Sequence, residues 1–139
     1  NNAITSFETA LNYCHYQPHA LVSLAQCYKE SGEIKKSHEY LEKALEINPD
    51  DNMIYIEFGR LYLEKYNDPE TALMYYHKSE EKGHRDDPWM YNEMSMAYEK
   101  SGNHEKAREY LYKAKALIDD GFGDQWVRKH IEERLLKYQ

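Results

Sequence analysis

The sequence predicts an all-α protein built from antiparallel helical hairpins. Apolar residues recur at the three- and four-residue spacing of amphipathic helices, and short segments with glycine or proline interrupt them. The same pattern returns after 34 to 36 residues. A composition that is 41% hydrophobic, with only four prolines and six glycines in 139 residues, favours one folded helical domain over disorder.

The first complete hairpin lies between residues 18 and 51, and Pro18 suits the first turn of its first helix. Gly32 can leave the helical region without steric cost and separates the two helices, while Pro49 ends the second. The apolar face of the first helix comprises Leu21, Leu24, Ala25 and Tyr28, and that of the second comprises Ile34, Leu41, Ala44, Leu45 and Ile47.

Repetition distinguishes this pattern from a chance hairpin. The first-helix pattern returns as Tyr55-x2-Phe58-Gly59-x2-Tyr62 and as Tyr91-x2-Met94-Ser95-x2-Tyr98. The second-helix pattern occurs as Ala3-x3-Phe7, Ser37-x3-Leu41, Ala72-x3-Tyr76 and Ala107-x3-Leu111. Small residues recur where the two helices of each hairpin must approach closely.

These two patterns resemble the signature of the tetratricopeptide repeat (TPR) family, W-x2-L-G-x2-Y followed by A-x3-F and P. The resemblance implies an α-α superhelix, a right-handed TPR solenoid whose first helices line a concave side. The segment Gly-His-Arg-Asp-Asp-Pro-Trp at 83–89 also resembles variants common in bacterial members. We expect one domain over 1–139, divided into a lone second helix at 1–17, repeats at 18–51, 52–87 and 88–121, and a capping helix at 122–139.

The two ends of the chain carry separate expectations. The helix at 1–17 has no first helix before it, which suggests a piece of a longer array and leaves Phe7 and Leu11 partly uncovered. We therefore expect weak self-association through this helix. At the other end an apolar stripe opposes a charged side, as expected of a capping helix; the stripe comprises Val127, Ile131, Leu135 and Tyr138.

Composition and spacing argue against several functions. The net charge of −7 disfavours binding to nucleic acid, and no apolar run is long enough to insert in a membrane. Two cysteines without a signal peptide favour a cytoplasmic location. The seven histidines lack the spacing of metal ligands, and no phosphate-binding loop or nucleophile elbow is present, so we expect no metal, no cofactor and no catalysis.

The function that remains is protein–protein interaction. By resemblance, a peptide or helix of a partner would bind the concave groove, and the apolar residues of helix 52–65 suggest a mainly apolar ligand with Arg60 setting its register. For Met53 and Trp89, packing between adjacent repeats is the alternative explanation. The predicted groove residues are Val22, Gln26, Met53, Ile56, Arg60, Leu63, Trp89, Asn92 and Met96.

One well-known set of TPR proteins grips the C-terminal carboxylate of heat-shock chaperones with lysine, arginine and asparagine. This sequence has Val22, Gln26, Glu57, Trp89 and Glu93 at those places, and the two glutamates would repel a carboxylate. Chaperone binding of that kind is therefore not expected. Two other roles stay open, a structural segment of a longer repeat array and a sensory or regulatory domain attached to an enzyme.

Overall fold

The computed structural model describes residues 2–13 and 18–139, and every element in these ranges is helical. The predicted all-α fold is therefore confirmed. The elements are α1 Asn2–Tyr13, α2 Pro18–Ser31, α3 Ile34–Ile47, α4 Asn52–Glu64, α5 Pro69–Glu81, α6 Pro88–Lys100, α7 His104–Asp119, α8 Gln125–Leu135 and the short 3₁₀ helix η1 Leu136–Tyr138.

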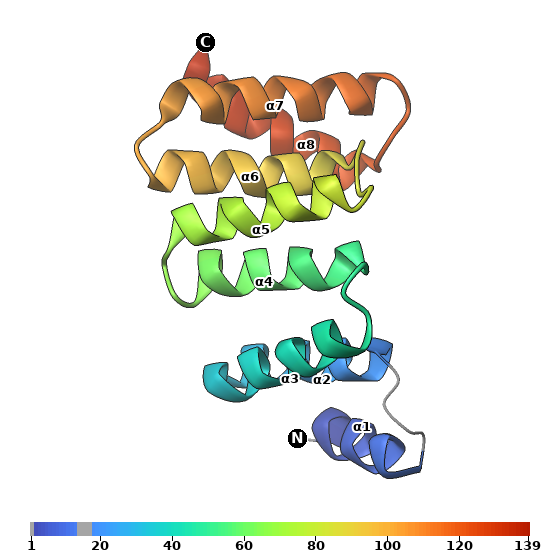
Figure 1. Cartoon of the computed structure of the whole chain (residues 1–139). Helices are drawn as coiled ribbons and strands as arrows, with labels where there is room; N and C mark the ends of the chain where they lie inside the picture. The colour runs from blue at the N-terminus through green and yellow to red at the C-terminus, as the bar shows by residue number, and fades with distance from the viewer. Residues whose placement is uncertain (1, 14–17) are drawn as a thin grey trace.

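The helices form a stack of hairpins, α2 with α3, α4 with α5 and α6 with α7. The first helix of each hairpin also contacts the first helix of the next, so α2, α4, α6 and α8 form a continuous row that we call the first-helix layer. The stack runs from α1 at one end to α7 and α8 at the other (Figure 1).

The turns lie where glycine and proline interrupt the helical pattern. Gly32 adopts a φ of 86° between α2 and α3, a backbone conformation that L side chains rarely adopt. Asn67, also at positive φ, lies in the longer turn between α4 and α5. Asp68 then accepts a hydrogen bond from the backbone N–H of Thr71, and Pro69 begins the helix.

The core lies between hairpins as well as within them. One cluster of buried side chains joins α2, α3 and α4, a second joins α4 to α7, and a third joins α7 to α8. Because each cluster draws on adjacent hairpins, each hairpin buries the apolar face of its neighbour, which is the reason that such units stack.

The two helices of the hairpin α4–α5 approach each other closely at Gly59. Gly59 of α4 lies under the ring of Tyr76 of α5, and an added Cβ would come within 2.8 Å of the ring. The corresponding pairs are Ala25 with Leu41 in the preceding hairpin and Ser95 with Leu111 in the following one. The smallest residue therefore accompanies the largest partner.

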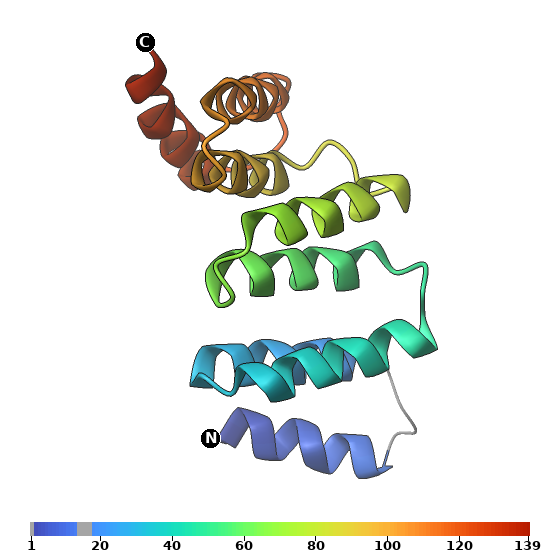
Figure 2. The same cartoon turned by 60° about the vertical axis from the view of Figure 1, so that its left-hand side comes forward.

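The two ends of the stack are held differently. At the first, α1 packs on α2, and the Tyr28 hydroxyl donates a hydrogen bond to Glu8. At the other, α8 lies beside α6 and α7 (Figure 2) and buries Ile131 and Leu135 against them. The side chains of Phe7 and Leu11, on which the expected self-association depends, lie outside the described residues.

Candidate functional site

The nine predicted groove residues all lie on α2, α4 and α6, in the first-helix layer. Their exposure divides them into three groups. Gln26 and Met53 are exposed, Val22, Arg60, Trp89 and Met96 are half-buried, and Ile56, Leu63 and Asn92 are buried.

The expectation that Ile56, Leu63 and Asn92 lie open in a groove is wrong. Ile56 and Leu63 are 1% and 3% exposed and belong to the cluster between α4 and the following hairpin. Asn92 is fully buried, and its side-chain and backbone oxygens accept hydrogen bonds from Arg134 of α8, at 2.5 and 3.0 Å. Packing between repeats accounts for all three because successive first helices contact one another.

Three large apolar residues remain accessible at equivalent places of successive first helices. Met53 is 41% exposed, Trp89 is half-buried, and Trp126 of α8 is 63% exposed. Each follows by two residues an aspartate that caps its helix: Asp51, Asp87 and Asp124. We call Met53, Trp89 and Trp126 the apolar row.

Trp126 is not among the predicted groove residues, because the charged and apolar sides of the last helix predicted only a cap. The aspartate two residues before each large apolar side chain was the available signal. Trp126 lies against Trp89, with ring centres 5.0 Å apart, and His130 lies 5.3 Å from Trp89. The row is therefore continuous between α6 and α8.

Arg60 is not the free donor that the sequence suggested. Its NH1 group donates to Glu57 at 2.7 Å and its Nε to Glu93 of α6 at 2.8 Å. Burial alone would lower the pKa of Arg60, but the two carboxylates raise it, so the guanidinium stays charged. Its hydrogen bonds link the adjacent first helices α4 and α6. We call Glu57 and Glu93, with Arg60 between them, the acidic cluster.

Burial in this cluster raises the pKa of Glu93 to about 7, even though Arg60 acts in the opposite direction. The second carboxylate oxygen of Glu93 is buried without a hydrogen-bond partner among the described residues. The hydroxyl of Tyr76, from α5, is buried and unpaired in the same way. Burial raises the pKa of Tyr76, whose ring lies against Gly59, the residue before Arg60 in α4.

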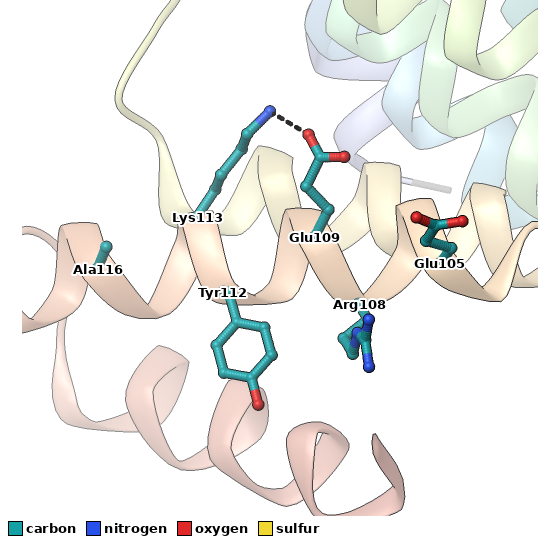
Figure 3. Close-up of a pocket in the computed structure, with 6 residues that line it drawn as sticks. All are labelled: Glu105, Arg108, Glu109, Tyr112, Lys113 and Ala116. Atoms are coloured by element: carbon teal, nitrogen blue, oxygen red, sulfur yellow. Dashed lines mark ion pairs between the residues drawn. The ribbon is translucent and has the colours of Figure 1, made fainter. Parts of the chain in front are cut away.

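A separate hollow of about 650 Å³ lies over α7 (Figure 3). Its lining comes from α7 alone, and Tyr112 and Arg108 point to one side of the helix while Lys113 and Glu109 point to the other. Lys113 pairs with Glu109 at 2.8 Å. Side chains that diverge from a single helix do not enclose a ligand, so this surface is a solvated helix face.

A smaller hollow of about 150 Å³ lies beside the apolar row and is lined by Trp126, Lys129, His130 and Glu133. Within residues 2–13 and 18–139, no cluster of His, Cys, Asp or Glu could hold a metal ion. No helix in these ranges is long and apolar enough to cross a membrane.

Comparison with family models decides the relationship of the chain. Residues 18–51 and residues 90–120 each match a model described as tetratricopeptide repeat. The chain is a tetratricopeptide repeat protein. A search of curated protein sequences found no match to it.

Solved structures share the fold of this TPR protein at low identity. A structure of MamA matches with a TM-score of 0.72 at 20% identity, over 84% of this chain and 67% of that one. The type III secretion translocator chaperone SycD of Yersinia enterocolitica matches with a TM-score of 0.77 at 16% identity, over 86% of this chain and 88% of SycD. YrrB, described as a TPR protein with an unusual peptide-binding site, matches with a TM-score of 0.72 at 22% identity. The match covers 94% of this chain and 64% of YrrB.

Proposed function

We propose that this TPR protein is a protein-interaction module that binds a peptide or a helix of a partner on its first-helix layer. The observation that carries the proposal is the apolar row, three large side chains that stay accessible at equivalent places of α4, α6 and α8. Exposed aromatic and methionine side chains that adjoin one another are typical of binding surfaces.

The accessible members of the predicted groove extend this surface. Met96 follows Trp89 by seven residues in α6 and lies on the same helical face, while Val22 and Gln26 continue the layer into α2. Ile56, Leu63 and Asn92 support this surface from beneath instead of contacting a ligand. A TPR protein described as having a peptide-binding site shares this fold, which favours a peptide over other ligands.

The proposal includes no catalysis by this chain. In the layer, Arg60 pairs with two glutamates and Arg134 with Asn92, and neither arrangement presents a nucleophile beside a general base. The cytoplasmic location expected from the sequence belongs to this proposal and stays a prediction.

Two methionines offer a matched test. Met53 in the first-helix layer is 41% exposed, and Met74, on the second helix of the same hairpin, is 47% exposed. We expect Met53→Asp to remove partner proteins captured from a lysate, read by mass spectrometry, while Met74→Asp retains them. Both substitutions are on exposed side chains, so the melting temperatures should stay close to that of the parent protein.

Retention of every partner by a folded Met53→Asp variant would contradict the proposal, as would equal loss with Met74→Asp. Ile56→Asp is unsuitable for this purpose. It would bury an unpaired charge and lower the stability of the fold whether or not the layer binds a ligand.

A further inference from the structure

A histidine joins the hairpin α4–α5 to the hairpin α6–α7 through both of its ring nitrogens. The Nδ1 of His77, on α5, lies 2.9 Å from a carboxylate oxygen of Glu80, three residues later in the same helix. Its Nε2 lies 3.2 Å from the hydroxyl of Tyr98, on α6. The side chains of His77 and Glu80 are 42% and 24% exposed, and Tyr98 is half-buried, so these three groups form a hydrogen-bonded chain that solvent can reach.

The carboxylate determines the direction of these hydrogen bonds. An ionised carboxylate can only accept, so the Nδ1 that faces Glu80 carries the ring hydrogen of neutral His77. The Nε2 is then an acceptor, and the hydroxyl of Tyr98 donates to it. A hydroxyl that donates to an imidazole, with the imidazole oriented by a carboxylate, is the arrangement in which histidine acts as general base for a nucleophile.

The preceding junction has the same residue types at longer distances. The hydroxyl of Tyr62 lies 3.4 Å from the Nε2 of His38, and the Nδ1 of His38 is 3.6 Å from Glu42. The second distance is too long for a hydrogen bond, so Glu42 does not orient His38 as Glu80 orients His77. Tyr62 is therefore a natural comparison for Tyr98 within the same chain.

We propose that Tyr98 is an acylation site, at which His77 accepts the phenolic proton and an activated acyl donor supplies the acyl group. The oxygen of Tyr98 forms a bond to the acyl carbon, and the bond from that carbon to the leaving group breaks. The proton passes to the Nε2 of His77 and from there to the leaving group, so an aryl ester and neutral histidine remain. Nothing is oxidised or reduced, and Glu80 acts as a positioning residue.

This inference goes beyond the proposed function and does not depend on a ligand of the first-helix layer. A hydrogen bond that only holds two hairpins together has a different consequence. It would leave half-buried Tyr98 less reactive than Tyr66 and Tyr112, which are 44% and 48% exposed. The order of reactivity among these tyrosines therefore distinguishes an activated hydroxyl from a structural one.

The probe is N-acetylimidazole, a small neutral acetyl donor, added in limiting amount to the full chain near neutral pH. Mass spectrometry of peptides measures the acetylation of each tyrosine with time. We expect Tyr98 to react at least about tenfold faster than Tyr66 or Tyr112, because a positioned general base typically contributes about 10²–10⁴-fold. Tyr62 should react more slowly than Tyr98.

Removal of the base tests the role of His77 directly. His77→Gln keeps a side chain that can hydrogen-bond but cannot act as a base of this kind, so acetylation of Tyr98 should become about tenfold slower. His104→Gln, at an exposed position of α7, makes the same chemical change elsewhere and should leave the rate unchanged. The rates of the exposed tyrosines should stay the same in both variants, which shows that the fold is retained.

A second pair tests the positioning residue and is independent of the substitution at His77. Glu80→Gln should slow Tyr98, whereas Glu81→Gln, an exposed neighbour with the same change of charge, should not. Acetylation of Tyr98 no faster than that of the exposed tyrosines would overturn the inference, as would an unchanged rate at Tyr98 in folded His77→Gln or Glu80→Gln. Capture of partners by the Met53 and Met74 variants decides the proposed function separately.

Discussion

At the scale of single residues, the fold depends on the match between Gly59 and Tyr76. Alanine is normally the better helix former, by about 1 kcal/mol. Here its Cβ would meet the Tyr76 ring at 2.8 to 3.0 Å, closer than ordinary contact. We expect Gly59→Ala to destabilise the protein by about 1–3 kcal/mol in denaturant unfolding, because overpacking outweighs helix propensity.

The adjacent hairpins provide the control for this substitution. The double variant Gly59→Ala with Tyr76→Leu recreates the small and large residues of Ala25 and Leu41. Gly59→Ala should then lower the free energy of unfolding less when leucine replaces Tyr76 than when tyrosine is present. A double-mutant cycle measures the difference. An equal cost in both backgrounds would contradict the close approach of α4 and α5.

Glu93, again a single residue, should make the free energy of unfolding depend on pH. Its pKa is raised from 4.5 to about 7, so between these values the folded protein holds a proton that the unfolded chain has lost. The resulting contribution to stability is fully present below about pH 4.5 and is lost as the pH rises to about 7. The slope reaches at most about 1.4 kcal/mol per pH unit.

Glu93→Gln should remove this part of the slope, since glutamine does not titrate and its side-chain oxygen can still accept from Arg60. Urea unfolding at several pH values from 5 to 8 measures it, with Glu39→Gln as the exposed control. A Glu93→Gln protein with the parent slope would show that this carboxyl does not retain its proton on folding.

At the scale of elements, α8 stabilises the last hairpin as well as extending the first-helix layer. Ile131 and Leu135 are buried against Leu111 and Ile118 of α7, and Arg134 satisfies the buried oxygens of Asn92. Truncation after Gly123 should therefore cost several kcal/mol, since each buried aliphatic side chain contributes about 1.5–3 kcal/mol. Circular dichroism melts measure the loss.

A point variant tests the same packing without removing the helix. Ile131→Ala should cost about 2–5 kcal/mol because it leaves a cavity in the core between α7 and α8. Leu136→Ala, at a side chain that is 66% exposed, should cost far less. An undiminished melting temperature in the truncated protein or in Ile131→Ala would mean that α8 does not contribute to the stability of α7.

At the scale of the whole molecule, weak self-association through α1 stays a prediction, because Phe7 and Leu11 lie outside the residues whose side chains are described. Light scattering up to millimolar concentration should show an apparent mass that rises with concentration and falls in Phe7→Glu. Exposed Thr5→Glu, on the same helix, makes the same charge change and serves as the control. A strict monomer at every concentration would exclude self-association through α1.

How the hairpins stack could be predicted because it depends on local and repeated features. The spacing of Leu21, Leu24, Ala25 and Tyr28 identifies a helical face, and its return after a fixed interval identifies repeated units that must cover one another. Gly32 and Pro69 mark turns through their own backbone restrictions. Each of these signals depends on neighbours within one helix or one turn.

The candidate site could be predicted only in part, for a related reason. The sequence by itself determined that the predicted groove residues lie on first helices, since helical periodicity assigns each residue to a face. The tertiary structure decided which of them are open: α6 covers Ile56, Arg134 of α8 reaches Asn92, and Glu57 with Glu93 engages Arg60. Burial and charge pairing depend on side chains from adjacent hairpins, 33 residues apart for Arg60 and Glu93, and periodicity within one helix carries no information about them.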